Sequence, residues 1–200
     1  MENNQYFSKN NNELPSNPKF IEALINGLKF KFKTDVGVFS RDFLDYATKL
    51  LLEKVDFCTL KKGKILDIGC GYGPVGIYVA KTTKNEVVML DINPRALELT
   101  KENLLINNVS ATVLESDCLN AVLNQKFEMA ILNPPIHAGK EVVYKMFEQS
   151  FQVLENGGSL WIVIQQKHGA PSAIKKLETI FKNVIITYKK KGFYIIKCVK

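Results

Sequence analysis

Asn133-Pro134-Pro135 is the stretch whose residue types could most directly handle a substrate group. Two consecutive prolines cannot continue a strand or enter a helix interior, so they fix an extended loop. The side-chain carbonyl of Asn133 and the backbone carbonyl of Pro134 could then accept both hydrogens of one planar NH₂ group. Two acceptors would hold such an amine and aim its lone pair at an electrophile. Asn-Pro is also a common turn pair, so a plain turn remains the alternative.

A second stretch, residues 64–74, combines an apolar strand, a glycine-rich turn and the start of a helix. Gly69, Gly71 and Gly73 let the backbone turn sharply and leave room for a ligand against it. Pro74 replaces the third glycine of a dinucleotide fingerprint, and no Walker lysine follows to make a P-loop. The turn either holds a ligand or is an ordinary strand-to-helix connection.

Alternating elements place these two stretches at one edge of a sheet. Strands are expected over residues 65–68, 86–90, 112–114, 127–132, 159–165, 184–188 and 193–199. The intervening helical patterns predict a doubly wound, mostly parallel seven-stranded sheet whose last two strands form an antiparallel hairpin. Asp67, Asp91, Asp117 and Asn133 end the first four strands. Ligands bind beyond the carboxyl ends of strands in such sheets, so these four residues indicate one site.

Two of these acids have specific interpretations. Asp91 lies 20 residues after Gly71, where a carboxylate can accept from both ribose hydroxyls of NAD or of S-adenosylmethionine (SAM). Its alternative role is to complement a helix dipole. Asp117 either contacts a ligand or caps a helix. The thiols of Cys70 and Cys118 are expected to be small pocket fillers rather than nucleophiles.

A small hairpin precedes the sheet. Asn26-Gly27 separates residues 19–25 from residues 28–34, and this dipeptide is a strong turn signal. Lys29, Lys31 and Lys33 form one face of its second strand, which is either solvated or meets an RNA backbone. Ser40 is expected to cap a helix running to about Asp56.

The amino-acid composition limits which classes of protein are possible. The 200 residues include 27 basic and 20 acidic residues, a net charge of +7 that permits an anionic partner without requiring one. Four cysteines without a C-x-x-C pair and two histidines are a poor metal set, so no metal is expected. No apolar run reaches the length of a membrane span and no signal-peptide pattern is present, so we expect a cytoplasmic protein without a membrane partner, and a monomer.

The pattern D-x-G-x-G-x-G formed by Asp67, Gly69, Gly71 and Gly73 resembles motif I of class I SAM methyltransferases. Asn133-Pro134-Pro135-Ile136 resembles motif IV of enzymes that methylate exocyclic amines of bases or glutamine amides. The resemblance implies a Rossmann-like class I methyltransferase fold, SAM as cofactor and S-adenosylhomocysteine as product. It assigns catalysis to Asn133, Pro134, Pro135 and Ile136, and cofactor binding to Asp67, Gly69, Gly71, Gly73, Asp91, Ile92, Asp117, Cys118 and Asn133.

Residues 35–40, 133–140 and 169–172 look like the single-domain relatives of small-subunit rRNA methyltransferase C, which methylate guanine N2 of 16S ribosomal RNA. The resemblance implies this reaction, with ribosomal RNA or the small ribosomal subunit as partner. It also implies substrate contacts by Phe39, His137 and Lys140. Two departures stand out, because Ile136 occupies a place where many relatives carry Phe or Tyr, and His137 a place where arginine is expected.

These observations divide the chain into a flexible N-terminus (1–18), a β-hairpin and loop (19–40) and a methyltransferase domain (41–200). Two alternatives keep the chemistry but change the amine, to adenine N6 or to a glutamine side chain of a translation factor. A third is a non-enzyme, an RNA-binding module with a degenerate methyltransferase fold. The basic run Lys189-Lys190-Lys191 is a second candidate RNA contact. No general base is evident.

Overall fold

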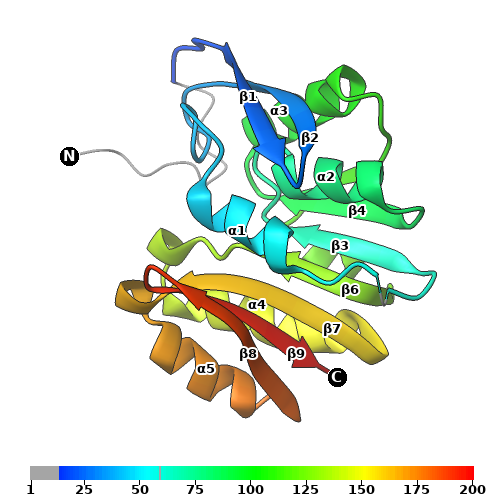
Figure 1. Ribbon diagram of the computed structural model, residues 1–200, viewed down its shortest axis with the longest axis vertical. Helices are drawn as coiled ribbons and strands as arrows, with labels where there is room; N and C mark the ends of the chain where they lie inside the picture. The colour runs from blue at the N-terminus through cyan, green and yellow to red at the C-terminus, as the bar shows by residue number, and fades with distance from the viewer. Residues whose placement is uncertain (1–13, 59) are drawn as a thin grey trace.

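The computed structural model describes residues 14–58 and 60–200 of the chain (Figure 1). The strands are β1 (Lys19–Ile25), β2 (Leu28–Thr34), β3 (Lys64–Ile68), β4 (Glu86–Asp91), β5 (Thr112–Glu115), β6 (Phe127–Leu132), β7 (Leu154–Gln165), β8 (Asn183–Lys190) and β9 (Phe193–Val199). The α-helices are α1 (Tyr46–Lys54), α2 (Pro74–Thr82), α3 (Pro94–Ile106), α4 (Lys140–Val153) and α5 (Ala170–Glu178). Short 3-10 helices are η1 (Asn120–Val122), η2 (Ile136–Ala138) and η3 (Gln166–His168).

Seven strands form the central sheet in the order β5-β4-β3-β6-β7-β9-β8. The neighbours from β5 to β7 are parallel, and β9 runs antiparallel to both β7 and β8. This arrangement confirms the predicted mostly parallel sheet with a C-terminal antiparallel hairpin. The carboxyl ends of β3, β4, β5 and β6 therefore meet at one edge.

Helices cover both faces of this sheet (Figure 1). Alternate residues of a strand enter different cores, as a strand buried on both faces requires. In β3, Ile65 belongs to the core cluster that includes residues of α1, α2 and α3, whereas Leu66 and Ile68 belong to the cluster that includes residues of α4 and α5. The two cores hold the sheet edge rigidly, which is what a site built on strand ends needs.

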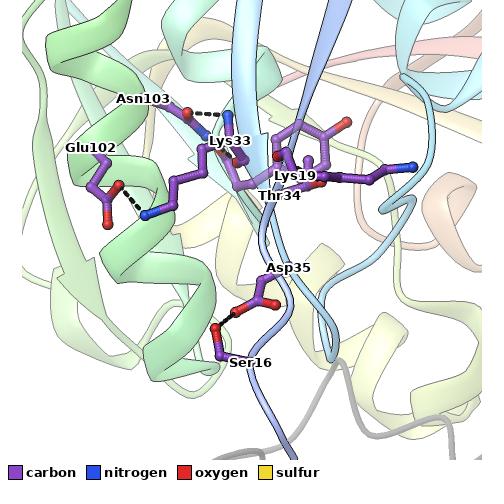
Figure 2. A network of polar contacts seen from close by, with 8 residues as sticks. Ser16, Lys19, Lys33, Thr34, Asp35, Glu102 and Asn103 are labelled. Carbon is purple, nitrogen blue, oxygen red and sulfur yellow. Dashed lines mark hydrogen bonds and ion pairs between the residues drawn. The ribbon is translucent and has the colours of Figure 1, made fainter.

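The predicted N-terminal hairpin is present as the two-stranded sheet of β1 and β2, and it docks on α3. Asn103 accepts from the Lys33 backbone N–H at 2.7 Å and donates to its carbonyl at 2.9 Å, and Figure 2 shows the two residues facing each other. Asn107, one helical turn later, donates to the Lys31 carbonyl at 2.8 Å and accepts from its N–H at 3.3 Å. Two side-chain amides thus satisfy backbone groups on the free edge of β2, as a further strand would.

The start of α1 differs from the expectation. Asp45 rather than Ser40 is its N-cap, with the carboxylate accepting from the Thr48 backbone N–H at 2.8 Å. Ser40 has a positive φ of 54°, which is incompatible with the extended conformation of an N-cap, and its hydroxyl donates to the Phe43 carbonyl instead. The helix is consequently shorter than predicted, and residues 40–44 are a loop.

Residues 14–17 are held against the body of the protein. Arg95 donates to the carbonyl of Leu14 at 2.6 Å, and Ser16 donates to Asp35 at 2.7 Å (Figure 2). The segment predicted to be flexible spans residues 1–18, of which residues 1–13 lie outside the described residues. Within the described ranges, no helix combines the length and apolar character needed to cross a membrane.

Candidate active site

A cavity of about 250 Å³ lies beyond the carboxyl ends of β3, β4, β5 and β6. Its lining includes most of the residues that the sequence singled out, namely Phe39, Asp67, Gly69, Cys70, Gly71, Asp91, Ile92, Asp117, Cys118, Asn133, Pro134 and Pro135. Ser40, Asp45, Thr48 and Tyr72, which no motif indicated as site residues, line it as well. The strand-end polar residues and the proline loop therefore share one site.

The glycine turn forms one wall of the cavity. Gly69 and Gly71 have positive φ values of 70° and 57°, and a Cβ built on either would meet no atom within 4 Å. Their backbone conformation requires glycine, and it leaves open space beside the turn. Gly73 has a different role, because it caps α2 with φ of 98°, and an added Cβ would come within 2.9 Å of Ile77. Gly73 thus shapes the turn without lining the cavity.

Asp91 is held rigidly by the backbone. One carboxylate oxygen accepts from the Gly71 N–H at 2.7 Å and the other from the Asn93 N–H at 2.9 Å. Burial raises the pKa of this carboxyl despite both hydrogen bonds. Asn93 caps α3 and also donates to the Gly37 carbonyl at 2.9 Å. This bond ties the loop that carries Phe39 to the end of β4.

Asp67 lies beneath the turn rather than in open space. Its carboxylate accepts from the Gly76 backbone N–H at 2.8 Å, near the start of α2. The pKa of Asp67 is raised to about 7, because burial and the negative charge of Asp91 raise it more than the Gly76 hydrogen bond lowers it. The side chain joins β3, the turn and α2 into one unit.

The third strand end contributes Asp117 and Cys118. Asp117 pairs with Lys145 of α4, with 3.2 Å between carboxylate oxygen and Nζ. Cys118 takes a positive φ of 50° and is buried, and burial together with its Asp117 neighbour raises the pKa of the thiol to about 11. Burial also raises the pKa of Cys70 well above its ordinary range. Both thiols are protonated at neutral pH, as expected for fillers rather than nucleophiles.

The side-chain contacts of Asn133 are the part of the site that sequence patterns did not predict. Its Nδ2 donates to Asp45 Oδ2 at 3.1 Å and to Thr48 Oγ1 at 2.9 Å. Both partners belong to the N-terminus of α1, more than 80 residues earlier in the chain. A D-x-x-T pattern could have identified Asp45 as a helix cap, but nothing local indicates that it meets Asn133. The amide oxygen is the atom left to act as an acceptor for a substrate.

Tyr72, in the turn, was also missed. Only 2% of its surface is exposed, and within the described part of the chain its hydroxyl has no hydrogen-bond partner. Burial raises the pKa of this phenol, and the Asp45 charge adds to the effect. A buried hydroxyl that lines a cavity without a partner is a group available to a ligand.

Among the residues after the prolines, Ala138 lines the cavity, whereas Ile136, His137 and Lys140 do not. Ile136 in η2 is half-buried against the core that includes α4, and His137 and Lys140 are exposed. His137 lies near enough to His168 that its charge helps lower the pKa of His168, after burial and the Lys167 charge. Contacts of His137 and Lys140 with a substrate stay predictions, and any such contact would be made at the protein surface. No three His, Cys, Asp or Glu side chains of residues 14–58 and 60–200 gather as a metal site.

Comparison with solved structures identifies the fold. The T. thermophilus 16S rRNA N2 methyltransferase RsmC, solved in complex with AdoMet and guanosine, superposes with a TM-score of 0.84 and 26% identity. The superposition covers 94% of this chain and 52% of that one. The mixed seven-stranded sheet, its flanking helices and the N-terminal hairpin are therefore the Rossmann-like fold of class I methyltransferases.

Comparison with protein families and curated proteins identifies the family. The model of the methyltransferase small domain matches residues 29–197. The uncharacterised protein YbxB of Bacillus subtilis (strain 168) is 45% identical over 174 residues, which is 86% of each chain. The ribosomal RNA small subunit methyltransferase C of Haemophilus influenzae (strain ATCC 51907) is 39% identical over 132 residues, 64% of this chain and 39% of that protein. The chain belongs to the methyltransferase small domain family, and its fold is that of the class I SAM-dependent methyltransferases.

Proposed function

We propose that this protein transfers a methyl group from SAM to an exocyclic amine, and that the amine is N2 of a guanine in 16S ribosomal RNA. The observation that carries the proposal is the fixed amide of Asn133, which borders the same cavity as the glycine turn and Asp91. The similarity to RsmC, including 39% identity to the H. influenzae protein, supports guanine N2 over other amines.

The lining of the cavity fits SAM. Two backbone N–H groups hold the Asp91 carboxylate in an orientation from which it can accept from a ribose diol. The turn at Gly69 and Gly71, which has open space beside it, can lie against the amino-acid portion of SAM. Asp117 can accept from the adenine amine at the far strand end. The Tyr72 hydroxyl, which has no hydrogen-bond partner among the described residues, offers one more polar contact. Carboxylates on several sides also suit a ligand whose sulfonium and ammonium groups are positive.

SAM, when bound, supplies a methyl group on a positively charged sulfur. The protein's own part is to hold the amine, and we propose that Asn133 Oδ1 and the Pro134 carbonyl, both from the cavity wall, accept its hydrogens. An exocyclic amine is a weak nucleophile because its lone pair is delocalised into the ring, and two acceptors favour release of that lone pair. Positioning of this kind can supply a large share of a rate enhancement.

Two lysine groups were candidate RNA contacts, and their surroundings differ. In β2, the Lys33 charge is paired with Glu102 at 2.7 Å, and Lys31 lies 4.6 Å from the Phe20 ring centre, much as Lys189 lies 4.6 Å from the Tyr194 ring centre. Lys191, in the turn between β8 and β9, lies 5.8 Å from the ring centre of Tyr46, the residue after Asp45. We infer that this turn, rather than β2, is the main phosphate contact.

The turn between β8 and β9 contacts η3 and the start of α1, where Asp45 lines the cavity. The Gln166 N–H donates to the Gly192 carbonyl at 2.7 Å, and the Tyr46 and Phe193 ring centres are 5.4 Å apart. In Figure 1 this turn and the start of α1 lie on the side where the β7 arrow ends. Phe39, Phe43 and Tyr46 are exposed there and could stack with unpaired bases.

The test is to incubate purified protein with methyl-labelled SAM and either 16S rRNA or small ribosomal subunits, and to identify the labelled nucleoside after digestion. We expect N2-methylguanosine. Label in N6-methyladenosine would move the target to adenine, and label in protein glutamine would move it to a translation factor. Failure to bind SAM in calorimetry would instead favour an RNA-binding module without activity.

A further inference from the structure

We propose that Asp45 and Thr48 are positioning residues that lock the amide of Asn133 with its oxygen toward the substrate. This inference rests on the proposed function, because the orientation of the amide matters only if Asn133 holds the substrate amine. Asp45 and Thr48 are assigned no contact with the reacting atoms. The two residues open α1, and Asn133 follows β6, so the contact joins elements far apart in the chain.

The chemistry of the partners fixes which way the amide faces. The Asp45 carboxylate can only accept, so the group at 3.1 Å from it must be the NH₂ of Asn133 and not the carbonyl. The Thr48 hydroxyl donates to Asp45 Oδ2 at 3.1 Å, which leaves its oxygen to accept from Asn133 at 2.9 Å. The two donors of the amide thus have two acceptors, and a flipped amide would place its oxygen against a carboxylate.

The network is partly shielded from water, and one of its members is held by the backbone. Thr48 is buried, and Asp45 and Asn133 are partly buried. Asp45 is itself held by the Thr48 backbone N–H at 2.8 Å, so the helix start presents its carboxylate at a fixed place. Without these acceptors the amide could rotate about its last side-chain bond, and its oxygen would face the substrate for only part of the time.

The structure allows variants that separate positioning from folding. Asp45→Ser keeps a good helix cap but is too short to reach Asn133, whereas Asp45→Asn keeps an acceptor oxygen at full length. Thr48→Val keeps the shape of the buried side chain without an acceptor, and Thr48→Ser restores the hydroxyl. Each pair differs in the contact with Asn133 far more than in the packing of α1.

We expect Asp45→Ser and Thr48→Val to lower kcat about 10- to 100-fold, as loss of a supporting hydrogen bond commonly does. The SAM dissociation constant and KM for RNA should stay within about twofold, and Asp45→Asn and Thr48→Ser should recover most of the kcat. A kcat within twofold of native for both contact-breaking variants would overturn the proposal. A loss of kcat that parallels a loss of SAM affinity would also overturn it.

A second measurement does not depend on turnover. Hydrogen exchange of the Asn133 side-chain NH₂, followed by NMR and assigned by its absence in Asn133→Ala, should be slow in native protein. It should become at least tenfold faster in Asp45→Ser and Thr48→Val, and unchanged exchange would refute the lock. Slow native exchange in a protein that methylates no RNA would instead count against the proposed function while the lock stands.

Discussion

Asp67 is buried beneath the glycine turn and Asp91 is half-buried beside it, close enough that the charge of Asp91 raises the pKa of Asp67. Among the described residues, no positively charged side chain lowers the pKa of either carboxyl. Hydrogen bonds from backbone N–H groups are what lower it. Such an arrangement costs stability in the protein without ligand, and a cationic ligand would offset that cost. Sites that bind charged ligands commonly carry this kind of local destabilisation.

Asp67 makes stability depend on pH in a direction that can be tested. Its pKa rises from 3.8 to about 7 on folding, so between these values the folded protein holds a proton that the unfolded chain has released. The free energy of unfolding should therefore fall as pH rises from about 4 to about 7, and Asp91 acts in the same direction. Asp67→Asn keeps an acceptor for the Gly76 N–H and removes the titration.

Thermal melts of cofactor-free native protein and of Asp67→Asn, taken from pH 5 to pH 8, check this expectation. The Tm difference between variant and native should shift in favour of the variant as pH rises. A difference that stays constant across the range would mean that Asp67 has an ordinary pKa in the folded protein.

At the scale of elements, the hairpin of β1 and β2 is held to α3 by amides rather than by a continuous sheet. Asn107 is the clearer test case, because it both accepts from and donates to the backbone of Lys31. Asn107→Asp preserves the shape but cannot donate to the Lys31 carbonyl, and it buries a charge. We expect a loss of about 2 to 4 kcal/mol in the free energy of unfolding, measured by urea denaturation.

Asn108→Asp is the matched control for this substitution. Asn108 is the next residue, is exposed and has a positive φ of 55°, which aspartate tolerates. It should change the free energy of unfolding by less than about 0.5 kcal/mol. Equal effects at the two positions would show that the amide bridge contributes nothing specific.

The elements also show what sequence reasoning can reach. The sheet, the strand-end acids and the cap at Asn93 follow from local patterns, namely alternation of element types and residue preferences at helix starts. The cap of α1 was predicted at Ser40 because preferences alone cannot reveal that the loop bends Ser40 into a positive φ. The contact of Asp45 with Asn133 could not be predicted, since it depends on how α1 packs over the end of β6.

At the scale of the whole molecule, basic and aromatic residues from the start of α1, η3 and the β8–β9 turn lie together next to Asp45, which lines the cavity, and we call this surface the mouth of the cavity. The chain spans 39% of the length of the H. influenzae relative and 52% of the T. thermophilus chain. We propose that this mouth provides the RNA contacts that the chain itself supplies. Phosphate contacts release counterions, and binding that depends on them weakens with salt.

Replacing Lys189, Lys190 and Lys191 with glutamine should therefore reduce the salt dependence of RNA binding. The slope of log affinity against log salt concentration should become shallower by about 0.7 for each phosphate of single-stranded RNA that the variant no longer neutralises. The matched control replaces Lys29 and Lys31, exposed residues of β2, and should leave the slope unchanged. A shallower slope in the control alone would place the RNA on the hairpin instead.

The most direct test of whether the proline loop takes part in catalysis uses the variant Asn133→Ala. Its rate of methyl transfer and its affinity for SAM are both compared with those of the native protein. The variant should bind SAM within a few-fold of native, because the turn, Asp67 and Asp91 are untouched. Its methyl transfer to RNA should fall by at least about 100-fold, comparable to losing a transition-state hydrogen-bonding group. Methyl transfer at the native rate would remove Asn133 from the mechanism and contradict the proposed use of this site.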